Sequence, residues 1–144
     1  MPSARRTIVI NRPIHDVFAF FADAENDTQW RSGVKEIRRN GELGVGTQYH
    51  QRVAGPMGRA IAADIEVTAY EPERHVAFQA IAGPVRPRGD YTFREAGDAT
   101  EVTFAMDVEL SGLKKLLMAS MVQKTMDAEV AGLERAKSVL ESRA

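Results

Sequence analysis

The hydrophobic period of the chain changes at Gly112, and this change constrains the fold more than any other feature. From residue 34 to residue 110 apolar and polar residues alternate in short runs, which is typical of strands with one buried face. From residue 113 to the end, about thirty residues without proline follow a period of 3.6, which predicts one long C-terminal helix. A sheet and a helix that each carry one apolar face bury these faces against each other.

The apolar residues of this predicted helix form one stripe about 120° wide at 100° per residue. The stripe consists of Met118, Val122, Met126, Val130, Leu133, Ala136 and Leu140. Charged and polar residues occupy the opposite side, namely Lys124, Asp127, Glu134, Arg135 and Ser138. The last predicted strand alternates as clearly, with an apolar face made of Val102, Phe104, Met106 and Val108. We expect the stripe to lie against this face of the sheet.

Turn residues such as Asn40-Gly41 and Gly97-Asp98 divide the rest of the chain into short strands. The predicted strands are 6–11, 34–40, 47–54, 59–70, 75–82, 89–95 and 101–110. Because the connections among the last six are short, neighbouring strands should pair in antiparallel fashion. Between the first two strands, Pro13 and apolar residues at helical spacing predict a helix, and residues 23–30 predict a second, shorter one.

Composition indicates a globular protein with a single domain over residues 1–144. The chain is long enough to build a core, and its 44% hydrophobic and 27% charged residues are close to the soluble average. A net charge of -1 gives no electrostatic support to nucleic-acid binding. No cysteine is present, which excludes disulfides and thiolate chemistry. We recognise no signal peptide and no integral membrane segment, so the expected location is cytoplasmic.

Short motifs follow one another in a fixed order along nearly the whole chain. They are Asn11-Arg12-Pro13 with Val17-Phe18, residues 23–30 followed by Val34, Gly44 with Gly46, residues 70–74, Tyr91-Thr92-Phe93, and residues 100–104. In this order they resemble the START and Bet v 1-like superfamily, and especially its polyketide cyclase/dehydrase branch. The resemblance implies an α+β helix-grip fold. In that fold a curved antiparallel sheet of about seven strands wraps on the long C-terminal helix, and two short helices follow the first strand.

The resemblance also implies a cavity between the sheet and the long helix that holds a small hydrophobic or amphipathic molecule. Alternation along the predicted strands and the helix stripe selects the side chains that face this space. They are Trp30, Tyr49, Gln51, Ile65, Phe78, Tyr91, Phe93, Phe104, Met106, Met118, Val122, Met126 and Glu129. We interpret them as a ligand site with an apolar wall and a few orienting polar groups. The alternative is an ordinary filled core in which the tyrosine hydroxyls have backbone or solvent partners.

Glu129 places a carboxylate on the apolar stripe of the predicted helix. A buried carboxylate needs a partner or has a raised pKa, which is how a general acid or base is prepared. The alternative is that Glu129 reaches solvent or pairs with an arginine such as Arg52 or Arg88. That alternative carries more weight than a catalytic role.

A second set of apolar residues, Leu113, Leu116, Leu117 and Met121, lies on the side of the helix opposite the main stripe. We expect a separate short helix at the mouth of the cavity, covered by the loop 83–89, or a dimer contact, or a lip where the ligand enters. The neighbouring Lys114 and Lys115 either meet an acidic headgroup or form a solvated face. The protein is accordingly expected to be a monomer or a homodimer.

No pattern for a metal, nucleophile or cofactor emerges. His15, His50 and His75 lie on different predicted elements without metal-ligand spacing. There is no Gly-x-Ser-x-Gly elbow, and the glycine-rich turns lack the helix and the lysine of a phosphate site. We therefore expect neither a metal nor another cofactor.

Three functions remain open at this point. Binding or transport of a lipophilic ligand ranks first, because the apolar wall alone is enough for it. A polyketide cyclase or dehydrase acting by proton transfer on a bound polyketone ranks second. The polar residues that such an enzyme would use, Tyr49, Gln51, Arg52, Tyr91 and Glu129, show no tight acid–base constellation. A co-chaperone-like protein-interaction module, with a small filled cavity, ranks third.

Overall fold

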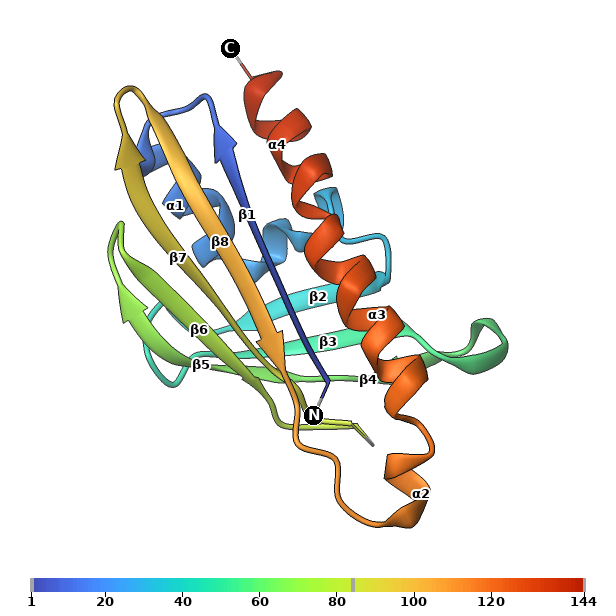
Figure 1. Cartoon of the computed structure of the whole chain (residues 1–144). Helices are drawn as coiled ribbons and strands as arrows, with labels where there is room; N and C mark the ends of the chain where they lie inside the picture. Colours follow the sequence, from blue (N-terminus) through green and yellow to red (C-terminus); the bar gives the residue numbers. More distant parts are fainter. Residues whose placement is uncertain (1, 84, 144) are drawn as a thin grey trace.

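A curled antiparallel sheet wraps around the C-terminal helix in the computed structural model, which describes residues 2–83 and 85–143 (Figure 1). The strand order is β1-β8-β7-β6-β5-β3-β2, and β4 adds a short pairing to β3. The strands are β1 (Ser3–Ile10), β2 (Val34–Asn40), β3 (Gln48–Ala54), β4 (Ala60–Ala62), β5 (Ile65–Glu71), β6 (His75–Ala80), β7 (Arg88–Ala96) and β8 (Ala99–Asp107). The predicted α+β fold, with its antiparallel sheet and C-terminal helix, is confirmed.

The strand predicted over 59–70 is divided into β4 and β5. Both segments pair with β3, which makes Asp64 the point where the ladder is interrupted. The Asp64 carboxylate accepts a hydrogen bond from the backbone N–H of Gln51 at 3.1 Å. Because a side chain replaces a backbone partner here, the strand breaks at this residue.

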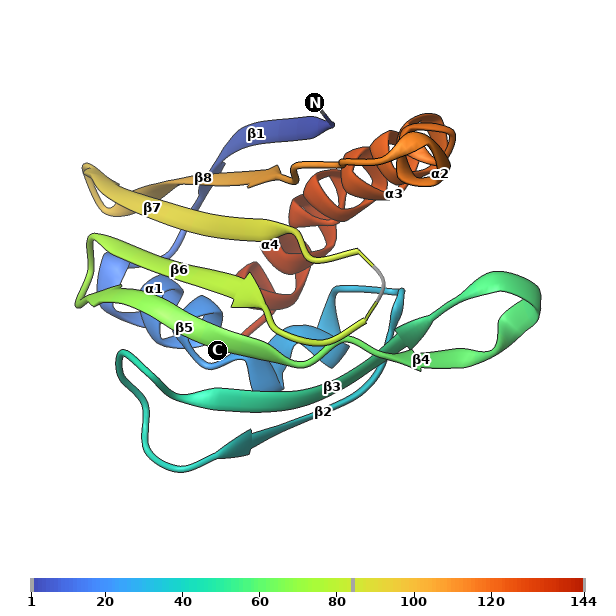
Figure 2. The same cartoon turned by 90° about the horizontal axis from the view of Figure 1, so that it is seen from below.

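Two short helical elements follow β1, as predicted, and cover one end of the sheet. They are α1 (Ile14–Ala22) and the 3-10 helix η1 (Ala24–Gln29). Asp23 caps η1 by accepting a hydrogen bond from the N–H of Glu25 at 3.1 Å. Figure 2 shows both elements inside the curve of the sheet, where α1 buries Val17, Phe18 and Phe21.

The C-terminal helix is interrupted, which corrects the prediction of one continuous helix from residue 113. Its main part consists of α3 (Ala119–Ala131) and α4 (Leu133–Glu141), and α2 (Leu113–Leu116) is a separate turn. Gly132 lies at this interruption and has little space around it, because a Cβ there would lie 3.0 Å from the Glu129 carbonyl oxygen and 3.3 Å from the Trp30 indole. Gly132 thus lets the helix approach the largest side chain of the core.

Burial along the helix confirms the predicted stripe and shows a gradient. Leu133, Ala136 and Leu140 on α4 are fully buried, whereas Val122 and Met118 near the start of α3 are only partly buried. The predicted polar side of the helix is exposed throughout. The interior is therefore closed at the α4 end and less completely covered toward α2.

Among the described residues, no helix combines the length and the apolar character that crossing a membrane requires.

Candidate functional site

Four polar side chains meet inside the sheet, between η1, β3 and α3. The guanidinium of Arg31 donates to both carboxylate oxygens of Glu129, from Nε at 2.7 Å and from Nη2 at 3.2 Å. Its Nη1 donates to Asp27 Oδ2 at 2.8 Å and to Gln51 Oε1 at 3.0 Å. The side chains of Arg31, Asp27 and Glu129 are only 13%, 5% and 15% exposed. We call these four residues the Arg31 cluster.

Local structure positions each member of the cluster. Asp27 and Arg31 are four residues apart, and the backbone N–H of Arg31 donates to the Asp27 carbonyl at 2.8 Å, so one turn places both side chains together. Gln51 is on the inward face of β3, and its amide donates to the Ala63 carbonyl at 2.8 Å, which leaves Oε1 directed at Arg31. Glu129 comes from the side of α3 that faces the sheet.

Burial sets the electrostatics of this cluster. It raises the pKa of Asp27 to about 6, against the opposing effect of the Arg31 guanidinium. Burial alone would lower the pKa of Arg31, but the carboxylates of Glu129 and Asp27 raise it above its ordinary value. Burial also raises the pKa of Tyr91 well above its ordinary value, and the Asp27 charge adds to this shift. At neutral pH the cluster therefore holds a permanent cation beside a carboxyl group that titrates near pH 6.

Two polar atoms beside the cluster lack a hydrogen-bond partner among the described residues. They are Asp27 Oδ1 and the indole nitrogen of Trp30, and both are buried. The Trp30 indole nevertheless opposes the rise of the Asp27 pKa as a hydrogen-bond donor does, so the two groups interact with each other without a hydrogen bond of normal geometry.

Aromatic rings form the wall next to these atoms. Tyr91 stacks on Phe104 with ring centroids 4.4 Å apart, and Trp30 meets Phe104 edge-on at 5.9 Å. The Phe78 ring meets the Tyr91 ring edge-on, with ring centroids 6.0 Å apart, and extends the wall toward β5. Beyond the rings, the sheet and α3 present apolar side chains that are only partly buried, namely Ile65, Phe78, Met106, Met118 and Val122.

The structure brings some of the predicted site residues together and separates others. Trp30, Gln51, Tyr91, Phe104 and Glu129 surround or belong to the Arg31 cluster. The partly buried wall contains five more of the predicted residues, namely Ile65, Phe78, Met106, Met118 and Val122. Met126 packs in a second cluster with Val108 and Leu110, beside Met106 and Val122.

Two further predicted residues, Tyr49 and Phe93, make their contacts in the packed interior. The Tyr49 hydroxyl donates to Asp23 at 3.3 Å and accepts from the N–H of Ala24 at 3.3 Å, so it fixes the start of η1. Phe93 packs edge-on against Phe18 at 5.2 Å in the closed part of the core. For these two side chains the filled-core interpretation describes the contacts that they make.

The partner of Glu129 differs from the arginines considered from sequence. Arg52 is exposed on the outward face of β3, and Arg88 pairs with Asp107 at 2.9 Å. Sequence reasoning missed both Asp27 and Arg31. Their spacing of four residues in a short helical segment was an available signal, but nothing local indicates that Glu129 comes from 98 residues further along the chain.

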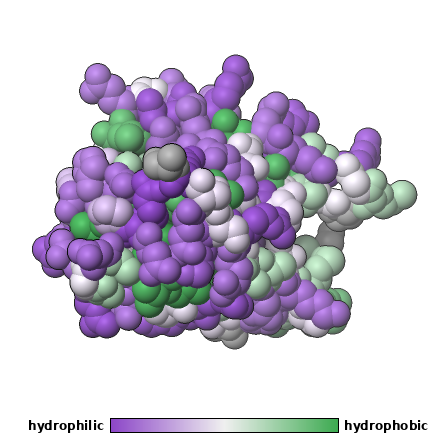
Figure 3. All heavy atoms as spheres, turned by 90° about the horizontal axis from the view of Figure 1, so that it is seen from above, coloured by the Kyte–Doolittle hydropathy of each residue, from purple (hydrophilic) through white to green (hydrophobic). Residues whose placement is uncertain are grey.

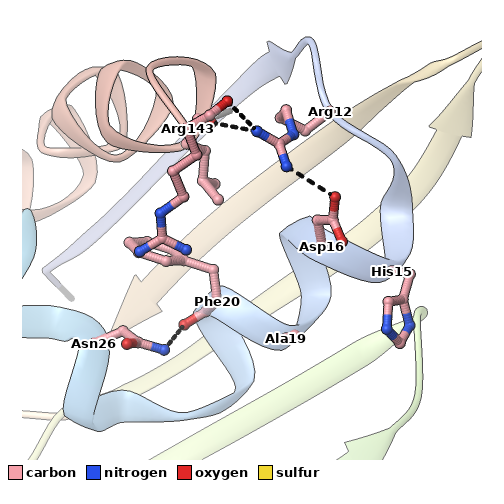
Figure 4. A pocket seen from close by; sticks show the side chains of 8 residues that line it. Arg12, His15, Asp16, Ala19, Phe20, Asn26 and Arg143 are labelled. Carbon is pink, nitrogen blue, oxygen red and sulfur yellow. Dashed lines mark hydrogen bonds and ion pairs between the residues drawn. The ribbon is translucent and has the colours of Figure 1, made fainter.

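Two surface hollows lie away from this site. One, of about 290 Å³, lies between α1 and the end of α4, where Arg12 donates to the Leu140 and Arg143 carbonyls and to Asp16 (Figure 4). The Arg143 guanidinium lies over the Phe20 ring there, 5.0 Å from its centroid. The second hollow, of about 200 Å³, is on the outer face of the sheet and includes Thr68, Arg88 and Asp107. Neither lies between the sheet and α3.

Metal binding has no support within the ranges 2–83 and 85–143. No three His, Cys, Asp or Glu side chains of the described residues are grouped so that they could hold an ion. The ionisable groups of the Arg31 cluster are instead satisfied largely by one another.

A family model described as polyketide cyclase/dehydrase and lipid transport matches residues 1–139. A comparison with curated proteins finds no match. Solved structures with the same fold include TTHA0849 from Thermus thermophilus, with a TM-score of 0.77 and 21% identity over 99% of this chain and 100% of that chain.

Two further solved structures come from a START superfamily protein and from a protein of a biosynthetic pathway. A START superfamily protein from Mycobacterium smegmatis has a TM-score of 0.76 and 15% identity, over 96% of this chain and 97% of that chain. The di-domain ARO/CYC StfQ from the steffimycin biosynthetic pathway has a TM-score of 0.74 and 14% identity, over 98% of this chain and 51% of that chain. At these identities the structures show that the fold is shared.

Proposed function

Because the chain belongs to the polyketide cyclase/dehydrase and lipid transport family, we propose that it binds a small hydrophobic or amphipathic molecule between the sheet and α3. The observation that carries this proposal is the position of the Arg31 cluster at the inner end of a partly buried apolar wall. A ligand site combines such a wall with a few polar groups that orient the molecule.

The two ends of this site have different chemistry. The inner end offers the Asp27 carboxyl group, one oxygen of which makes no hydrogen bond of normal geometry, and the Tyr91 phenol, which its raised pKa keeps protonated. The outer end offers only aliphatic and aromatic surface from Ile65, Met106 and Val122. The ligand class that fits is a molecule with a hydrophobic body and one hydroxyl or carbonyl group at its inner end.

The single tryptophan of the chain supplies the test, because Trp30 lies beside the Arg31 cluster. Energy transfer from Trp30 to N-phenyl-1-naphthylamine should saturate at one probe per chain. Val122→Phe places a larger side chain in the space proposed for the ligand. It should weaken probe binding about tenfold, since the loss of this space costs roughly 1–2 kcal/mol of binding free energy.

Ala128→Phe is the matched control, because residue 128 is on the exposed side of the same helix. It should leave probe binding unchanged. Equal binding by both variants, or no saturable transfer in the unmodified protein, would contradict the proposal.

Proton transfer on a bound polyketone is a second candidate, and the raised pKa of Asp27 favours it. A carboxyl group that titrates near pH 6 exchanges protons readily at physiological pH. Asp27→Asn should then abolish conversion of a poly-β-ketone model compound while probe binding persists. Glu134→Gln, which changes an exposed carboxylate on α4, is the control that should keep turnover. Turnover that survives in Asp27→Asn would exclude Asp27 as the proton-transferring group.

A further inference from the structure

We propose that one end of the molecule docks on the surface of an anionic lipid bilayer. This end, which we call the α2 end, comprises the turn 55–59 between β3 and β4, the β6–β7 connection at residues 81–83 and 85–87, and residues 111–121 around α2. Figures 1 and 2 place these three segments at the same side of the molecule.

Contacts show that the three segments form one continuous end. A Cβ on Gly83 would lie 2.7 Å from the carbonyl oxygen of Ala62, so the β6–β7 connection lies directly against β4. Val85 packs against the cluster of Val108, Leu110 and Met126 under the start of α3. The β6–β7 connection therefore joins the β3–β4 turn to the α2 region.

Large apolar side chains are unusually exposed at the α2 end. Met57 is 98% exposed at the tip of the β3–β4 turn, and Leu117 is 79% exposed just after α2. Leu113, Leu116 and Met121 are exposed as well, so five of the eight exposed large hydrophobic residues in the described ranges are at this end. The opposite end of the molecule presents a mainly hydrophilic surface (Figure 3). Clustered exposure of this kind marks an interaction site.

The same segments carry only positive charge. Residues 55–59, 81–87 and 111–121 contain no Asp or Glu in the sequence, although the whole chain has a net charge of -1. Arg59 and Arg86 are exposed there, as is Lys124 one turn further along α3, and none of the three forms an ion pair with a described residue. The sequence adds Lys114 and Lys115 within α2. An anionic surface complements this charge.

The combination of protruding apolar groups and basic residues favours a bilayer over a protein partner. A protein interface of standard size needs about 800 Å² of complementary surface on each partner. The exposed apolar groups here do not form one such surface, because Met57 and the α2 leucines project from two separate elements. A fluid interface accepts separate apolar side chains at a depth of roughly 5–10 Å, while Lys and Arg meet the lipid phosphates. The proposal rests on the proposed function in one respect, since the bilayer would be the source or destination of the lipophilic ligand.

Sedimentation with vesicles tests the docking. The protein should co-sediment with vesicles of phosphatidylcholine mixed with phosphatidylglycerol and much less with phosphatidylcholine alone. Leu117→Asp should weaken this binding at least about tenfold, and Lys124→Gln about fivefold, the value of one basic residue near an anionic surface. Binding should also fall as salt rises, because the Debye length shortens from about 8 Å at 0.15 M to about 3 Å at 1 M.

Val45→Asp is the matched control, because Val45 is 68% exposed on the β2–β3 loop, away from α2. It should bind vesicles like the unmodified protein. Equal loss in Val45→Asp and Leu117→Asp, or no preference for anionic vesicles, would overturn the proposal. A dimer in solution that Leu117→Asp dissociates would overturn it too, by assigning the α2 end to a second copy.

Probe binding to Trp30 without vesicles separates the two proposals. Leu117→Asp should keep the energy transfer from Trp30 unchanged while it loses vesicle binding. If the probe does not bind and vesicle binding still depends on Leu117, the proposed ligand site is wrong and the proposed docking surface is supported.

Discussion

Arg31 connects three parts of the interior, because its guanidinium donates hydrogen bonds to two carboxylates and one amide at the same time. Glu129 takes two of its hydrogen bonds, at 2.7 and 3.2 Å, and Asp27 and Gln51 take the others. Removing one partner of a largely buried pair leaves the other charge without compensation. The cluster therefore fixes α3 to η1 and β3 at the same place where it gives the site its polarity.

Glu129→Gln tests this role in stability. The variant should lower the free energy of unfolding by about 2 kcal/mol, because Arg31 loses a charged bidentate partner but keeps Asp27. Glu134→Gln breaks the exposed pair with Arg6 and should cost no more than about 0.5–1 kcal/mol. Urea denaturation of both variants measures the difference. Equal costs would show that the Arg31 cluster contributes no more than a surface pair.

Asp27 predicts a particular pH dependence of stability. Its pKa is about 6 in the folded protein and 3.8 as the reference for the unfolded chain, so the protonated form favours folding. Its contribution to the free energy of unfolding is fully present below about pH 4 and is lost as the pH rises through about 6. Asp27→Asn removes this dependence.

The stability of the unmodified protein relative to Asp27→Asn should therefore fall between about pH 4 and pH 7 and then stay level. Denaturation curves over this range measure the difference. A difference that does not change with pH would mean that the Asp27 carboxyl group keeps its ordinary pKa when folded.

At the level of elements, the period of the apolar residues predicted correctly which faces of the helix and strands point inward, because this depends only on residues close in sequence. The apolar stripe from Met118 to Leu140 follows from the helical period and the inward face of β8 from alternation, and both are buried except at Met118, Val122 and Met106, which are partly buried. The close approach of Gly132 to the Trp30 ring was missed because Trp30 lies about a hundred residues earlier in the sequence. The Arg31–Glu129 pair was missed for the same reason. Contacts between distant residues leave no local pattern.

Gly132→Ala tests the packing of the helix on Trp30. Alanine favours a helix over glycine by about 1 kcal/mol. Its Cβ would lie 3.0 Å from the Glu129 carbonyl oxygen and 3.3 Å from the Trp30 indole, which Phe21, Tyr91 and Phe104 hold in place. Overpacking costs roughly 1–3 kcal/mol, so a net loss of stability and a lower Tm are expected. In a Trp30→Phe background the same change should become neutral or stabilising, and a cost that persists there would place the strain elsewhere.

The molecule has two unlike ends. At one end α1, η1 and α4 close the sheet with residues that are fully buried, such as Phe21 and Leu133. At the other end the wall under α3 is only partly buried, and the apolar and basic residues of the α2 end surround it. A ligand that entered from the α2 end would meet the apolar wall first and the Arg31 cluster last.

Native mass spectrometry of the protein purified from its own cells tests the central claim most directly. We predict a chain mass increased by one lipophilic molecule, which denaturing extraction releases unchanged. The Val122→Phe variant should carry much less of it, and Ala128→Phe should carry as much as the unmodified protein. A bare chain mass in all three proteins would contradict the claim that the space between the sheet and α3 is a ligand site.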